Sequence, residues 1–141
     1  MPLDPTFVGR AFPLARPYVV GLEKLREFVT AIGVDPDRLS EFGPGAVAPP
    51  TFAVVVISAA QDALLFDPTL GLDFSRVVHR DQRFVHHRPI RVADVLFTTV
   101  HVDGIRMLAG NDVLTVRTEV TDAAGAAVCT AVGTLVARAA A

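Results

Sequence analysis

The chain has 141 residues, of which 51% are hydrophobic and 20% are charged, and its formal net charge is −2. This length suits a single domain built around one core, which we expect to span residues 1–141. Acidic and basic residues are interspersed, so the sequence lacks the basic patch of a nucleic-acid-binding protein. The mean hydropathy of +0.44 is high for a small domain. It predicts that an apolar face is buried against another chain.

The cysteine content and the apolar stretches indicate the cellular compartment in which the protein is expected. Cys129 is the one cysteine, which excludes an internal disulfide and makes a zinc cluster unexpected. Residues 1–17 lack the apolar stretch after a basic start that marks a signal peptide. The longest apolar run, Thr51–Phe66, is too short and too polar to span a bilayer. We therefore expect a cytoplasmic protein that does not enter a membrane.

The first third of the chain predicts one extended segment and one helix. The extended segment is expected at Pro17–Val20 and the helix at about Leu22–Ile32, where apolar residues recur at helical spacing and charged residues take the other face. Gly33 is suited to end this helix. The following segment, Val34–Ala48, is rich in Asp, Pro and Gly and predicts a loop with a turn at Gly43–Gly45.

A second helix is predicted over Thr51–Phe66. Pro49 and Pro50 precede it and Pro68 follows it, as is common where helices begin and end. The β-branched run Val54–Ile57 would suit a strand, but the length of the segment and its alanines favour a helix. Because this helix is apolar nearly all round, it belongs in a core.

Four strands are expected in the second half of the chain. We interpret Asp103-Gly104 as a bulge, since a hairpin turn there would leave a poorly filled segment before the turn at Gly110-Asn111. Another turn is expected at Asp122–Gly125. The predicted strands cover about Arg76–His87, Asp94–Met107, Asp112–Thr121 and Ala126–Arg138.

The last strand links the sheet to the buried helix. One of its faces consists almost entirely of small residues, among them Cys129, Ala131 and Gly133. Such a face allows a helix to approach a sheet closely, and the helix over 51–66 is the obvious occupant. The sequence thus predicts an α+β fold in which an antiparallel sheet wraps around a long central helix.

Six short motifs occur in an order that resembles a known family. They are Thr6–Gly9, Glu23–Phe28, Ala48–Phe52, Val77–Phe84, Arg88–Ile90 with Ala93–Leu96, and Ala109–Asp112. Together they resemble the N-terminal MaoC-like dehydratase family over roughly residues 4–138. The nearest likeness within it is to the accessory subunits of (3R)-hydroxyacyl-ACP dehydratase, of the HadA/HadC type.

The resemblance implies a hotdog fold, pairing into a dimer with a continuous sheet, and a role in fatty acid synthesis. It also implies an acyl thioester substrate on CoA or acyl carrier protein, no cofactor, and removal or addition of water across the Cα–Cβ bond. In active members an Asp and a His about five residues apart act on the water. Here the corresponding loop keeps Asp35, but Arg38 or Leu39 stands where the histidine would be. The likeness therefore implies an accessory subunit whose partner, in a heterodimer, supplies the Asp/His pair.

Six residues are candidates for the site, and each of them also has a simpler structural interpretation. Asp35 is a weak catalytic candidate, and a lone Asp before Pro is most simply a turn former. Pro50, Thr51 and Phe52 begin the second helix, where the free N–H groups of Thr51 and Phe52 would meet a thioester oxygen, or Pro-Pro merely begins a helix. His79 and Gln82 are candidates to line an acyl pocket, or they are ordinary strand residues.

Strand alternation places these residues on two faces. It puts His79 with Asp81, Arg83 and His87, and Gln82 with Phe84 and His86. Adjacent histidines diverge on a strand, so no metal site is expected.

Two other functions stay open. One is a non-catalytic homodimer that binds acyl thioesters or acts as a scaffold. The other is a thioesterase, which would need a carboxylate aimed at the thioester from the central helix. Asp62 lies on that helix, but about three turns from its N-terminal end.

Overall fold

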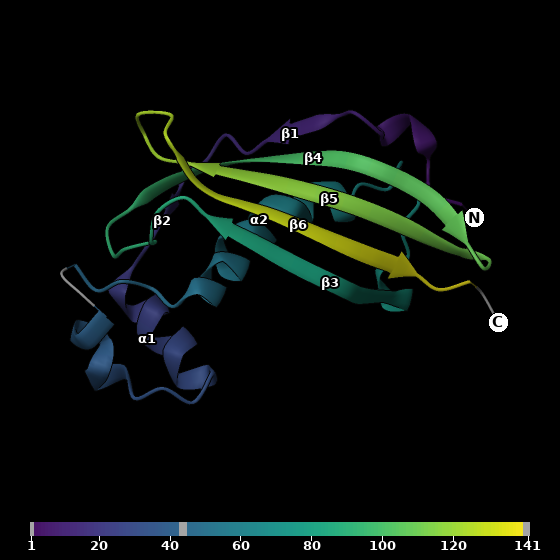
Figure 1. Cartoon of the computed structure of the whole chain (residues 1–141). Coiled ribbons are helices and arrows are strands. Elements are labelled where there is room, and N and C mark those ends of the chain that lie inside the picture. Colours follow the sequence, from purple (N-terminus) through teal and green to yellow (C-terminus); the bar gives the residue numbers. More distant parts are fainter. Residues whose placement is uncertain (1, 43–44, 140–141) are drawn as a thin grey trace.

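The computed structural model describes residues 2–42 and 45–139, so most of the turn predicted at Gly43–Gly45 lies outside the described residues (Figure 1). These residues form two α-helices and six strands. Their bounds are β1 Ala11–Pro13, β2 Tyr18–Val19, α1 Leu22–Ala31, α2 Ala53–Leu65, β3 Val77–His86, β4 Val95–Leu108, β5 Asn111–Thr121 and β6 Ala127–Ala137. Short 3-10 helices cover Pro5–Phe7, Pro36–Phe42, Pro50–Phe52 and Phe74–Arg76.

The strands form one antiparallel sheet with the order β1-β4-β5-β6-β3, and β2 pairs with β4 beside it. The helix α2 lies against one face of this sheet, and α1 projects from one end of the molecule, away from the sheet (Figure 1). The predicted α+β architecture, an antiparallel sheet around a central helix, is confirmed. The four predicted long strands and both helices are found within one or two residues of their expected ends. The short strand β1 was not predicted.

The close packing of α2 on the sheet follows from the small face of β6. Cys129 and Ala131 are fully buried, as are Ala53, Ile57 and Ala60 of α2. With almost no side chain between them, the helix and the strand come into van der Waals contact over this face. One side of α2 is exposed in the single chain, so this helix is not buried all round as predicted. The exposed residues on α2 and at its end are Val54, Ser58, Ala59, Asp62, Ala63 and Phe66.

Two bulges shift the alternation of the strands. The register of β4 against β5 slips between Val102 and Gly104, which confirms the bulge predicted at Asp103. A second slip, between His79 and Asp81 in β3, was not predicted. Because Arg80 is an extra residue there, the side chains before and after it change face.

The segment between α1 and α2 is not the plain loop that its composition predicted. Pro36–Phe42 winds into a 3-10 helix, and Leu39 from this helix is buried in the core. Nearby, the fully buried ring of Phe52 packs edge-on against Phe28 of α1 at 5.4 Å and Tyr18 of β2 at 6.5 Å between centroids. These aromatic contacts join α1 and β2 to the start of α2.

Within the described residues, no helix is long and apolar enough to cross a membrane.

Replacing Phe52 by Ala should lower the free energy of unfolding by about 3–5 kcal/mol, because it removes a fully buried ring and leaves a cavity. The measurement is urea unfolding followed by circular dichroism. Phe74→Ala is the matched control, since Phe74 is 42% exposed, and it should cost at most about 1 kcal/mol. Equal losses for the two variants would contradict the assigned core.

Candidate functional site

An apolar hollow of about 470 Å³ lies where the chain enters α2 and where β3 ends. Its walls come from two stretches, Val47–Pro50 and His86–Ile90. A backbone hydrogen bond joins these stretches, in which the N–H of Ala48 donates to the carbonyl of Ile90 at 2.7 Å. A mostly apolar hollow with a few polar groups is the usual form of a small-molecule site.

His86 is the polar side chain that ties the two walls together. Its Nε2 lies 2.9 Å from the carbonyl oxygen of Pro50. A carbonyl only accepts, so Nε2 carries the proton and donates it. His86 was not among the predicted site residues. Its role depends on a contact between residues 36 positions apart, which the local sequence does not show.

The 3-10 helix Pro50–Phe52, which leads directly into α2, consists of the three residues that were predicted to bind substrate at the helix start. Pro50 lines the hollow, and Thr51 is exposed. The N–H of Phe52 is not free as expected, because it donates to the carbonyl of Pro49 at 2.9 Å. The ring of Phe52 is fully buried in the core. Among the described residues, the N–H of Thr51 is therefore the donor left over at this end of the helix.

His79 and Gln82 lie elsewhere. The bulge places both on the face of the sheet that α2 covers, together with Phe84 and His86, so the predicted assignment of His79 to the opposite face was wrong. Gln82 lies over Gly133, whose added Cβ would stand 2.8 Å from Oε1 of Gln82. His79 is seven residues from His86 along an extended strand, roughly 20 Å away. Within one chain, His79 and the hollow therefore do not form one site.

Asp35 and its neighbours form a helix start. The carboxylate of Asp35 accepts from the N–H of Asp37 at 2.9 Å, at the beginning of the 3-10 helix Pro36–Phe42. Leu39, near the position where an active relative would carry histidine, is 4% exposed. This arrangement is the one expected for a turn-forming Asp.

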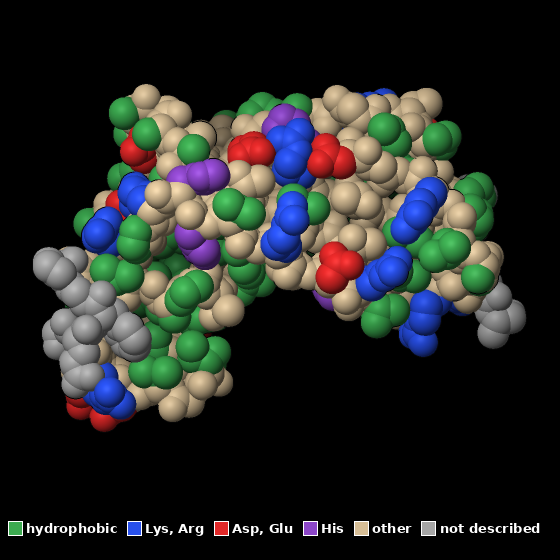
Figure 2. Space-filling model, in the orientation of Figure 1, with side chains coloured by type: hydrophobic (Ala, Val, Ile, Leu, Met, Phe, Trp, Pro, Cys, Tyr) green, Lys and Arg blue, Asp and Glu red, His purple; other side chains and the backbone are tan. Residues whose placement is uncertain are grey.

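Two arginines whose side chains could bind phosphate are paired with carboxylates instead. Arg88 makes two hydrogen bonds to Asp94, at 2.8 and 3.3 Å, and the hydrogen bond to Asp94 raises the pKa of Arg88. On the sheet face away from α2, Arg117 binds Asp103 at 3.0 Å and Glu119 at 2.7 Å. Figure 2 shows acidic and basic side chains side by side in the middle of this outer face.

The hydroxyl of Thr130 extends the polar contacts of Arg117 and Glu119 on the outer face. Thr130 donates to Glu119 at 2.8 Å, and the ring of His87 contacts the same hydroxyl oxygen at 3.2 Å. Burial alone would raise the pKa of Glu119, but the hydrogen bonds from Thr130 and Arg117 bring it below its ordinary value. The contacts connect β3, β6, β5 and β4 and stabilise their register.

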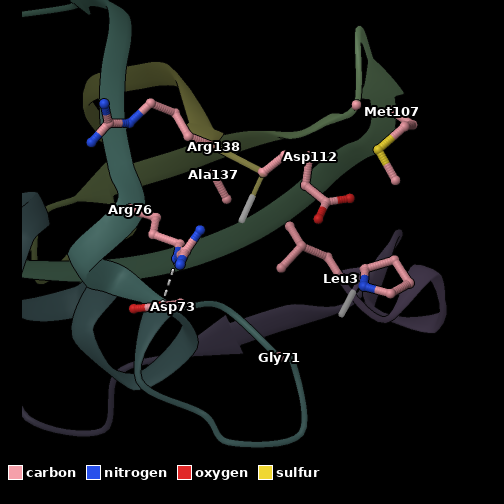
Figure 3. Close-up of a pocket in the computed structure, with 11 residues that line it drawn as sticks. Leu3, Gly71, Asp73, Arg76, Met107, Asp112, Ala137 and Arg138 are labelled. Carbon is pink, nitrogen blue, oxygen red and sulfur yellow. Dashed lines mark ion pairs between the residues drawn. The ribbon is translucent and has the colours of Figure 1, made fainter. Parts of the chain in front are cut away.

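A second hollow, of about 520 Å³, lies at the opposite end of the sheet (Figure 3). Arg76 and Arg138 lie on its wall, but so do Asp73 and Asp112, and Arg76 is paired with Asp73 at 3.2 Å. The mixed charges leave little net attraction for an anion. We therefore place the candidate site at the hollow beside α2.

Cys129 is fully buried on the face of β6 beneath α2. Burial, with a smaller effect of the Glu119 charge, raises the pKa of its thiol to about 11 from an ordinary value of 9.0. The thiol is therefore protonated in the folded chain at neutral pH and is a poor nucleophile.

This raised pKa predicts a loss of stability in alkali. Below pH 9 the thiol is protonated in both states, whereas between pH 9 and about 11 the unfolded chain loses the proton first, so the free energy of unfolding falls. Urea unfolding from pH 8 to 11 should therefore show a steeper decline for the wild type than for Cys129→Ala. The other groups that titrate in this range are the same in both proteins and should affect both equally. If the free energy of unfolding fell in parallel for the wild type and Cys129→Ala, the raised pKa would be contradicted.

The sheet, the central helix and the hollow at its start define a dehydratase-like protein of the hotdog class. Residues 6–131 match the model of the family described as "FAS1-like, dehydratase domain region". The chain belongs to this family. It is 54% identical over 145 residues to a UPF0336 protein of Saccharopolyspora erythraea, covering 98% of this chain and 93% of the relative.

Solved structures agree with this assignment. The HadBC (3R)-hydroxyacyl-ACP dehydratase complex of Mycobacterium tuberculosis is similar with a TM-score of 0.80 and 26% identity, covering 96% of this chain and 99% of the matched chain. A MaoC-like dehydratase matches with a TM-score of 0.81 and 31% identity, covering 95% of this chain and 43% of that one. The resemblance to MaoC-like dehydratases inferred from the six motifs is confirmed.

Proposed function

We propose that this chain is the acyl-binding subunit of a (3R)-hydroxyacyl-ACP or -CoA dehydratase in fatty acid synthesis. The whole chain would act as one cytoplasmic domain, with no cofactor, and a MaoC-like partner chain would supply the Asp/His pair. The observation that carries the proposal is the apolar hollow at the start of α2, which occurs in a chain whose own loop lacks the histidine.

The hollow suits the thioester end of an acyl chain. Its apolar walls, from Val47–Pro50 and His86–Ile90, would receive the first methylene groups of the tail. The N–H of Thr51 stands at the positive end of the α2 dipole, where it would donate to a thioester oxygen. His86 would hold the carbonyl of Pro50 and so fix the position of this donor.

The missing chemistry requires a second chain. General acid–base catalysis needs a proton donor or acceptor within hydrogen-bond reach of the substrate. Asp35 is engaged at the start of a 3-10 helix, and Leu39 is buried beside it. The similar HadBC protein is a complex of two subunits, which supports a partner for this chain as well.

His86→Ala should weaken the binding of trans-2-octenoyl-CoA by roughly tenfold, because the loss of one hydrogen bond frees the Pro50 carbonyl and the adjacent turn. The measurement is titration calorimetry on the purified chain. His101→Ala is the matched control, since His101 points to the outer face of the sheet. Unchanged affinity in His86→Ala would argue against the site.

The proposed division of labour is tested with crotonyl-CoA and longer trans-2-enoyl-CoAs. The chain alone should leave their absorbance unchanged. Mixed with a MaoC-like chain that keeps the intact Asp–His loop, it should raise turnover and shift the chain-length preference. Turnover by the lone chain would overturn the accessory role and direct attention to Asp35→Asn and His79→Ala. Binding without turnover in the mixture would favour the non-catalytic homodimer.

A further inference from the structure

A third hollow, of about 450 Å³, lies on the side of α2 next to the short strands β1 and β2. Its volume falls within the range of about 300–1,000 Å³ that is usual for small-molecule sites. It shares no lining residue with the hollow at the start of α2, so the two are separate. The residues that line it are Leu14, Arg16, Pro17, Tyr18, Val19 and Ala59.

This hollow exists because the connection between β1 and β2 is longer than the strand edge that it follows. The N–H of Leu14 donates to the carbonyl of Thr98 at 3.0 Å, and Tyr18 pairs with Leu96. The chain therefore takes four steps, from 14 to 18, while β4 takes two, from 98 to 96. The extra residues have to bend away from the sheet. Below them, Ala59 of α2 is too small to fill the space that they leave.

The polar side chains that line this hollow are hydrogen-bond donors. They are the guanidinium of Arg16, which is exposed, and the hydroxyl of Tyr18. Within the described part of the chain, neither side chain has a hydrogen-bond or ion-pair partner. Burial raises the pKa of the Tyr18 hydroxyl, against a smaller opposite effect of the Lys24 charge, so at neutral pH the hydroxyl keeps its proton. The hollow thus offers two donors, one of them positively charged.

The ligand that fits these walls has an apolar body and a single negative charge. The remaining lining side chains are apolar, so they exclude water from a hydrocarbon chain. One guanidinium balances one negative charge, and its parallel N–H groups match the two oxygens of a carboxylate. The uncharged end of a thioester's acyl tail would leave both donors of Arg16 and Tyr18 unused. The chemistry therefore favours an alkyl carboxylate over the tail of the thioester.

We propose that the third hollow binds a free medium-chain fatty acid, with its carboxylate held by Arg16 and Tyr18 and its alkyl chain against Leu14, Val19 and Ala59. The proposal does not depend on thioester binding, because the two hollows have separate walls.

The charge of the ligand is tested by titration calorimetry with octanoate. The wild type should bind octanoate, and it should bind 1-octanol, which has the same tail without the charge, roughly tenfold more weakly or less. Arg16→Gln should weaken the binding of octanoate roughly tenfold, because a hydrogen bond to a charged group is lost. Tyr18→Phe should weaken it by roughly threefold to fivefold, because it removes a neutral donor and keeps the ring.

Filling the hollow gives a second test that leaves the charges unchanged. Ala59→Phe places a ring in the wall of the hollow and should abolish the binding of octanoate. Ala63→Phe is the matched control, since Ala63 is exposed one turn further along α2 and does not line the hollow. It should bind octanoate as the wild type does. Circular dichroism checks that each variant keeps its fold.

Several outcomes would overturn the proposal. They are a wild type that does not bind octanoate, equal affinities for octanoate and 1-octanol, and an affinity that Arg16→Gln leaves unchanged. Equal losses in Ala59→Phe and Ala63→Phe would also contradict it. His86→Ala should keep the wild-type affinity for octanoate, because His86 lines the other hollow. A loss in that variant would assign the fatty acid to the thioester site instead.

Discussion

The packing of α2 against the small-residue face of β6 is the contact on which the rest of this fold depends. Cys129 and Ala131 leave little bulk between helix and strand, so the sheet can curve around the helix at close range. The position of α2 then determines where its first turn lies. The hollow at that turn exists because the chain before α2 and the chain after β3 meet there.

Long periodic segments could be predicted from the sequence, because their signal is local. The helices, the four long strands and the bulge at Asp103 each follow from spacing within a window of a few residues. The strand β1 has three residues, including Pro13, and exists because β4 offers a partner edge. The 3-10 helix over Pro36–Phe42 is likewise held by the burial of Leu39, a tertiary effect.

The site was less predictable, because it depends on contacts between distant segments. Pro50 and Thr51 were predicted as site residues from the chemistry of helix starts, whereas the contact of His86 with Pro50 joins residues 36 positions apart. The ring of Phe52 was expected at the site, but it fills the core, where it packs edge-on against Phe28 of α1 and Tyr18 of β2. A motif identifies a segment, but the direction of each side chain depends on its packing neighbours.

The single extra residue at Arg80 has a consequence for comparing this chain with its relatives. Alternation of faces makes a strand sensitive to insertions, since one added residue exchanges the two faces from that point onward. An alignment that runs through Arg80 without a gap, against a relative that lacks the bulge, would match residues facing the helix with residues facing solvent. In such an alignment, His79 would stand in the same column as a residue that faces the opposite side of the sheet. The extra residue should therefore be placed as a gap before any substitution pattern in this strand is interpreted.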